Sequence, residues 1–159
     1  MPSHDDMVRA QLVDFLKSGN AHATLDDAVK DFPSSEYANK PAGAPHNAWQ
    51  LLEHIRFTIH DLLDFCTNPA YHASEWPDAY WPAQETTTKQ GWNASVKALR
   101  KDFNDFEKLL QNPVVNLYAK IPWGKDQTIL REALLAIDHT SYHVGQLLML
   151  RKQLGEWKG

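Results

Sequence analysis

The stretch TILREALLAIDHTSYHVGQLLMLRKQL, residues 128–154, decides the fold. Thr128 is a suitable N-cap for a helix, and Gly155 follows the last apolar residue as a stop signal. The pattern predicts one helix of about 27 residues, or about 40 Å at 1.5 Å per residue, which is the length of a small domain. A helix of this length needs other helices of similar length to pack against.

The rest of the chain predicts three more long helices and one short one. The long ones are predicted from Asp5 to Ser18, from His46 to Cys66, and from Trp92 to Leu110, and the short one begins after Thr24 and stops at Pro33. Proline, glycine and tryptophan mark loops over residues 32–45, 68–85 and 114–127. With little strand signal, this order predicts an all-α four-helix bundle that forms a single domain over residues 1–159.

Composition limits the function. The chain has 159 residues, 43% of them hydrophobic, which is enough for one buried core. Lys and Arg number 16 against 20 Asp and Glu, and the net charge of −4 argues against a nucleic-acid partner. The single cysteine excludes an internal disulfide and a zinc site built from thiolates. No apolar run reaches about 18 residues and the first residues are polar, so we expect a cytoplasmic protein without a membrane partner.

Two histidines on the final helix are the strongest functional signal. His139 and His143 are four residues apart, about 40° around the helix, and lie within an apolar stripe. Side chains with this spacing point the same way, so their ring nitrogens can bind one cation together. The alternative is a pair of core histidines that are satisfied by hydrogen bonds and have no ligand.

A metal centre needs a third protein ligand, and His54 is the best candidate. It lies in the middle of the second long helix, on a mixed edge beside Gln50, Thr58 and Asp61. His46 is a weaker candidate for the rim of a pocket. The remaining histidines point away from this edge or fall in termini and loops, where ordinary surface positions are expected: His4, His22, His60 and His72.

The acidic residues argue against a peptidase. The residues between His139 and His143 include no glutamate, so the general base of a His-Glu-x-x-His protease is missing. Glu132 and Gln146 lie on the histidine face and are candidates to orient a ligand. Glu53 and Asp138 point away from their neighbouring histidines, which favours a solvated charge or a link between helices. The sequence assigns no catalytic side chain.

A second apolar stripe lies on the opposite side of the final helix. Its members are Leu130, Leu134, Ile137, Val144 and Leu148. Either this helix is central and the first helix and the loops cover the stripe, or the stripe joins a second copy. A two-fold homodimer is the commonest solution of the second kind, and we expect one.

Three segments together resemble the DinB-like family of metalloenzymes. They are HNAWQLLEHIR (46–56), EWPDAYWP (75–82), and TILREALL (128–135) running into DHTSYHVGQL (138–147). The resemblance covers most of the chain, from about Thr24 to Trp157. It implies a four-helix bundle in which His54, His139 and His143 hold a divalent metal, most often zinc or nickel, and it implies a homodimer. The family name refers to damage-inducible expression and not to DNA binding.

Characterised members of that family include thiol transferases and a mycothiol-dependent isomerase. The resemblance therefore implies a metal-dependent enzyme for small molecules, most plausibly one that transfers a low-molecular-weight thiol. We expect Gln50, Thr58 and Gln146 to wall its pocket. Trp76 and Trp81 either join this wall or, as we expect, close the end of the bundle. Cys66 is expected to be a small buried residue and not a nucleophile.

Three alternatives stay open at this point. The metal and the dimer are structural in a non-catalytic, stress-related protein, or water replaces the thiol and the site is a hydrolase. In the last alternative no metal binds, and the three histidines pack in a polar core where every ring nitrogen needs a hydrogen-bond partner.

Overall fold

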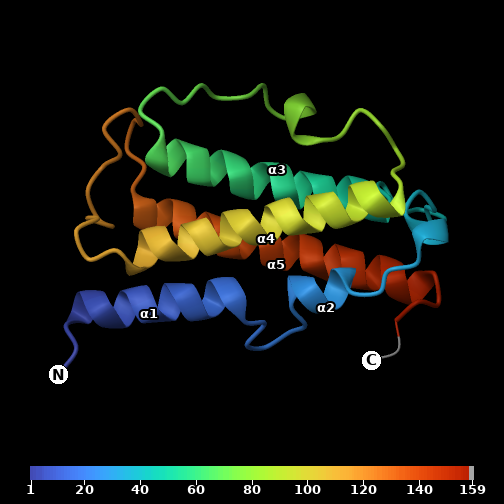
Figure 1. Cartoon of the computed structure of the whole chain (residues 1–159), viewed down its shortest axis with the longest axis horizontal. Helices are drawn as coiled ribbons and strands as arrows, with labels where there is room; N and C mark the ends of the chain where they lie inside the picture. Colours follow the sequence, from blue (N-terminus) through green and yellow to red (C-terminus); the bar gives the residue numbers. More distant parts are fainter. Residues whose placement is uncertain (158–159) are drawn as a thin grey trace.

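The chain forms a bundle of α-helices in a computed structural model that describes residues 1–157 (Figure 1). The helices are α1 (His4–Lys17), α2 (Leu25–Val29), α3 (Ala48–Thr67), α4 (Lys89–Gln111) and α5 (Ile129–Gln153), with short 3₁₀ turns at Ser34–Glu36 and Asp78–Tyr80. The described residues contain no strand, only an isolated bridge between Lys120 and Thr128. The predicted all-α class is confirmed.

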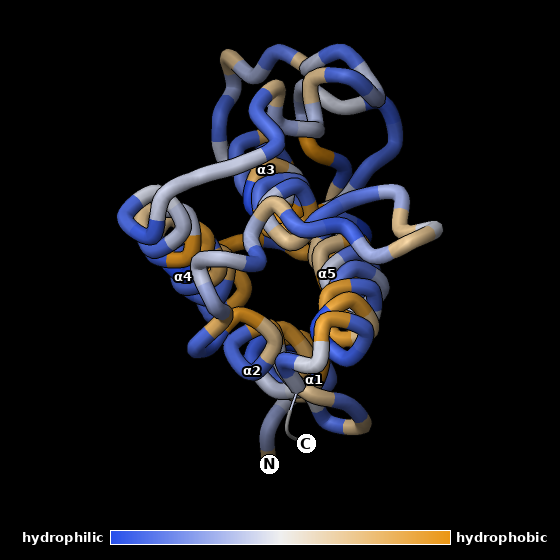
Figure 2. Tube along the Cα trace, turned by 90° about the vertical axis from the view of Figure 1, so that its right-hand side faces the viewer, coloured by the Kyte–Doolittle hydropathy of each residue, from blue (hydrophilic) through white to orange (hydrophobic). Residues whose placement is uncertain are grey.

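The bundle has four corners although it has more than four helices. Viewed from the end, α3, α4 and α5 each hold one corner, and α1 and α2 together hold the fourth (Figure 2). α3 packs against α4 and α5, while α1 contacts α4 and α5, and α2 contacts α5. The four-helix prediction is therefore correct as an architecture, with one corner divided between α1 and the short α2.

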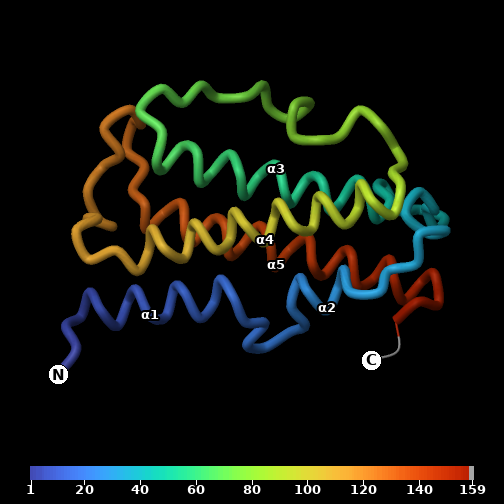
Figure 3. Tube along the Cα trace, viewed as in Figure 1, coloured from blue at the N-terminus to red at the C-terminus, as the bar shows by residue number. Residues whose placement is uncertain are grey.

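The connection between α3 and α4 determines which segment covers the middle of α3. α3 and α4 run in the same direction, because residues 68–88 return along the length of α3 before α4 begins (Figure 3). A crossover of this kind is an established way to connect parallel neighbours in a bundle. Its consequence is that this segment lies over the middle of α3, where His54 is located.

Side chains fix where the helices begin. The hydroxyl of Thr128 accepts a hydrogen bond from the Arg131 amide at the start of α5, at 3.1 Å. At the start of α3, Asn47 and Gln50 form a reciprocal capping box, with bonds of 2.9 and 3.0 Å. These caps explain why the predicted helix starts lie close to the observed ones.

Two buried arginines hold the divided corner in place. Arg9 of α1 donates to the carbonyl oxygens of Leu110 and Val115, at 2.7 and 2.6 Å, just where α4 ends. Arg151 of α5 donates to the carbonyl oxygens of Ala28 and Lys30, at 3.0 and 2.9 Å, just where α2 ends. Each guanidinium thus satisfies carbonyls that a helix end leaves unpaired.

The second apolar stripe of α5 packs mostly inside this one chain. Val144 is buried, and the partly buried Leu130, Ile137 and Leu148 pack against the core. Leu134 alone of the five is exposed, at 53%. The first of the two expected arrangements is therefore observed, and the homodimer stays a prediction. Nowhere in residues 1–157 is a helix both long and apolar enough to cross a membrane.

Candidate metal centre

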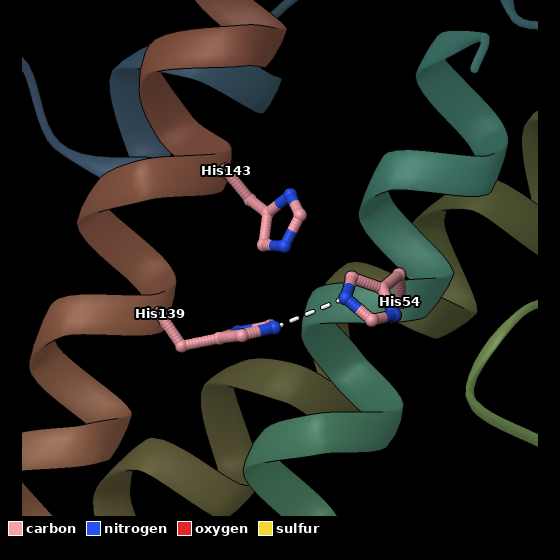
Figure 4. Close-up of side chains that lie close together, drawn as sticks. All are labelled: His54, His139 and His143. Atoms are coloured by element: carbon pink, nitrogen blue, oxygen red, sulfur yellow. Dashed lines mark hydrogen bonds between the residues drawn. The ribbon is translucent and has the colours of Figure 1, made fainter. Parts of the chain in front are cut away.

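Three histidines meet between α3 and α5. His54 extends from the middle of α3, and His139 and His143 extend toward it from successive turns of α5 (Figure 4). One ring nitrogen from each histidine lies within 4.8 Å of the other two, and the Nε2 atoms of His54 and His139 are 3.0 Å apart. His54 is 2% exposed and His143 is 7% exposed. The structure thus brings together the three residues predicted as ligands.

Hydrogen bonds fix which nitrogen of two rings is free. The main-chain carbonyl oxygen of Tyr80 accepts a hydrogen bond from Nδ1 of His54 at 2.9 Å, and Oε1 of Gln146 accepts one from Nδ1 of His143 at 2.7 Å. A carbonyl oxygen only accepts, so each Nδ1 carries the proton. The Nε2 atom of each neutral ring then has a free lone pair, which is the form that binds a metal.

Burial keeps the cluster uncharged. Desolvation, reinforced by the neighbouring histidines, lowers the pKa of His139 to about 3. Desolvation also lowers the pKa of His143 to about 4, although its bond to Gln146 acts in the opposite direction. The pKa of His54 is lowered for the same main reason. All three rings are therefore neutral near pH 7 and available to a cation.

The spacing of one donor pair suits a divalent cation. Two nitrogens that bind one tetrahedral zinc ion with bonds of about 2.0–2.1 Å lie about 3.3 Å apart, close to the separation of the His54 and His139 Nε2 atoms. Without a cation, Nε2 of His139 would donate a hydrogen bond to Nε2 of His54. Nδ1 of His139 would then carry no proton and would be a buried hydrogen-bond acceptor. That nitrogen has no hydrogen-bond partner among the described residues. Imidazole ligands suit zinc, nickel and copper alike, so the residues indicate the class of metal only.

Trp81 forms one wall of the centre. Its indole lies between two imidazoles, with ring centroids 3.9 Å from His54 and 3.7 Å from His46, and is nearly parallel to His54. Trp81 was expected to close the end of the bundle, with a place in the pocket wall as the alternative. The return of residues 68–88 along α3 brings it onto the ligand instead. Trp76 is 70% exposed and lies outside this stack.

A carboxylate holds the segment that orients His54. Asp61 lies two turns after His54 on α3 and accepts hydrogen bonds from the hydroxyls of Tyr71 and Tyr80, at 3.0 and 2.7 Å. Burial and the bond to Asp61 raise the pKa of both phenols, that of Tyr71 to about 12. The clamp fixes the main chain of Tyr80, whose carbonyl bonds to His54. The helical pattern predicts Asp61 on the same edge of α3 as His54, but no sequence pattern predicts its tyrosine partners in a loop.

The other predicted pocket residues divide into two groups. The Thr58 hydroxyl lies 3.5 Å from Nε2 of His139, and Gln146 bonds to His143, so both belong to the centre. Gln50 instead caps α3 through the amide of Asn47. Glu132 is 1% exposed and pairs with Arg131, and no hydrogen bond joins it to the three histidines.

The residues expected to be uninvolved lie outside the centre. Glu53 pairs with Arg56 and bonds to Ser95 of α4, which is the expected link between helices. Asp138 is exposed. His60 is on the exposed side of α3, with Nδ1 3.1 Å from Asp102. Cys66 is buried, and desolvation raises its thiol pKa to about 12, so it is not a nucleophile near neutral pH.

The fold and the site together define a helical bundle with a buried three-histidine cluster that suits a divalent cation. Residues 19–147 match the model of the DinB superfamily, and the chain belongs to this superfamily. This confirms the resemblance read from the sequence. No curated protein and no solved structure matches the chain significantly.

Proposed function

We propose that this protein binds a divalent metal ion through His54, His139 and His143 and transfers a low-molecular-weight thiol to a small electrophile. The observation that carries the proposal is the set of three neutral imidazoles, two of which have a fixed Nδ1 proton and a free Nε2. Zinc and nickel are the metals we propose first. Membership of the DinB superfamily, whose members often bind metals, supports the same choice.

A bound cation in this centre supplies positive charge that favours the thiolate form of a thiol. The new bond joins the thiol sulfur to the electrophilic carbon, the leaving group departs with its electron pair, and the thiol proton goes to solvent. The nucleophile comes from the substrate, because the raised pKa of Cys66 keeps this thiol protonated. Trp81 covers one face of His54 and excludes water from it.

The test is a transfer assay with the purified, metal-loaded protein. A panel of low-molecular-weight thiols is combined with chlorodinitrobenzene, and thioether formation is followed by absorbance. We expect the activity to disappear with a chelator, to return with zinc or nickel, and to be absent in His143→Ala. Activity that survives complete removal of the metal contradicts the proposal.

One observation favours a structural metal as the second candidate. His54 and His143 are both buried, and a cation held among buried ligands stabilises the fold directly. In that case chelation lowers the melting temperature strongly and no thiol or electrophile turns over. The transfer assay and a melting curve on the same samples separate the two functions.

A further inference from the structure

A cavity of about 300 Å³ lies next to the three histidines, between the loop before α3 and the last turns of α5. Its lining surface is mostly apolar and carries no charged side chain. The lining residues are Ala42, Gly43, Ala44, Pro45, His46, Leu51, Gln146, Met149, Leu150 and Gln153. This volume is at the lower end of the range for small-molecule sites. The lining suits a compact, uncharged ligand.

Two side chains join this cavity to the metal centre. Gln146 lines the cavity and also accepts the hydrogen bond from Nδ1 of His143. His46 lines it on the other side and stacks on Trp81, which stacks in turn on His54. A molecule in the cavity is thus one side chain away from the ligand cluster.

Charged side chains line a different hollow between α3 and α5. That hollow lies farther along the same two helices, beyond Asp61 on α3 and at the start of α5, and its lining includes Asp61, Lys125, Arg131 and Glu132. A charged ligand finds partners there and none in the apolar cavity. Burying an unpaired carboxylate is strongly unfavourable, whereas burying apolar surface is favourable.

We propose that the apolar cavity binds the uncharged, apolar body of the electrophilic substrate, with Gln146 and Gln153 as its hydrogen-bonding groups. This inference rests on the proposed function, because only that function makes the bound molecule a substrate. It adds that the protein selects uncharged electrophiles with aromatic or aliphatic bodies over anionic ones.

The test uses two probes of nearly equal size, para-nitrobenzyl alcohol and para-nitrobenzoate, and measures their equilibrium binding by ligand-observed NMR. We expect the alcohol to bind at least about tenfold more tightly than the carboxylate. Met149→Lys places a charge in the lining from an exposed position and is expected to weaken binding of the alcohol at least about fivefold. Equal binding of the two probes overturns the inference.

Leu134→Lys is the matched control. Leu134 lies on the same helix and is 53% exposed, against 57% for Met149, but it lines neither this cavity nor the charged hollow. The control is expected to bind the alcohol within about twofold of the parent protein. An equal loss in both variants overturns the inference, because the effect would then come from added charge and not from the cavity.

Transfer assays on the same variants separate this inference from the proposed function. Probe binding that responds to Met149→Lys in a protein without transfer activity supports the cavity and contradicts the proposed function. Transfer activity whose KM for chlorodinitrobenzene is the same in Met149→Lys and Leu134→Lys supports the function and overturns the cavity as the substrate site.

Discussion

Two neighbouring residues on α5 divide the molecule into the side that we propose as the binding side and a stabilising side. His143 faces α3 and joins a cluster of imidazoles, whereas Val144 faces the crevice that Leu16 and Leu25 also line. On the first side, polar rings are buried with a nitrogen left unpaired. On the second, apolar side chains are removed from water. The comparison indicates that α5 contributes stability through one face, whereas the other face carries an unpaired buried nitrogen at some cost in stability.

The largest expected effect is on the binding side. His139→Ala removes one of three ligands, and the affinity for zinc or nickel is expected to fall about 1,000-fold or more. The unfolding free energy of the metal-free protein should change by no more than about 1 kcal/mol, because lost packing is offset by removal of the unpaired Nδ1. Competition titration with a chromophoric chelator and chemical denaturation measure the two quantities.

His60→Ala is the matched control for that substitution. His60 lies on α3 like His54, but its side chain is 61% exposed. It should keep the parent affinity within about twofold. If His60→Ala and His139→Ala lose affinity equally, the cluster is not the metal site.

The reverse result is expected on the stabilising side. Val144 is 2% exposed, so Val144→Ala should lower the unfolding free energy by about 2 kcal/mol and leave the metal affinity unchanged. Urea denaturation of the metal-free protein gives the first value and the competition titration the second. A large loss of metal affinity in Val144→Ala would mean that the two faces do not act separately.

A smaller effect is expected from the carboxylate clamp. Asp61→Ala removes the acceptor for the hydroxyls of Tyr71 and Tyr80 and loosens the carbonyl that orients His54. We expect about a tenfold loss of metal affinity, as is common for groups that position a ligand. Asp138→Ala, which changes an exposed carboxylate directly before His139, should have no effect. Equal affinities of the two variants would show that the clamp does not position His54.

The smallest expected effect is a pH dependence of the metal-free protein. The folded-state pKa of His143, about 4, lies below the usual value of 6.5, so the unfolded chain binds more protons between these two values. Stability is therefore fully present above about pH 6.5 and declines as the pH falls toward 4. His143→Ala should reduce the loss between pH 7 and pH 6 by about 0.7 kcal/mol. Chemical denaturation at both pH values measures this loss. An equal loss of unfolding free energy in the parent protein and in His143→Ala would contradict the assignment of the pH dependence to His143.

Helix periodicity was sufficient to predict the architecture and the meeting of three histidines in space. Each of His54, His139 and His143 lies on a regular helix, where spacing along the sequence determines direction in space. The cap of α5 at Thr128 was equally predictable, because it depends on residues only three positions apart.

The residues around the ligands were harder to predict. Trp81 and Tyr80 reach His54 through a long crossover whose path depends on packing, and no periodic pattern encodes that path. Gln50 was expected in the pocket wall because of its position on the helix, but a local capping interaction with Asn47 takes its side chain. The predictions for the site were therefore wrong or incomplete for two reasons. A local capping interaction redirected one side chain, and the path of a long loop brought in side chains that no pattern predicts.

The most direct test of the central claim is elemental analysis of the purified protein beside His143→Ala, both without a histidine tag. We predict about one zinc or nickel ion per chain in the parent protein and almost none in the variant. Equal metal content in the two proteins, or no metal in either after incubation with zinc, nickel and manganese, would contradict the assignment of the histidine cluster as a metal centre.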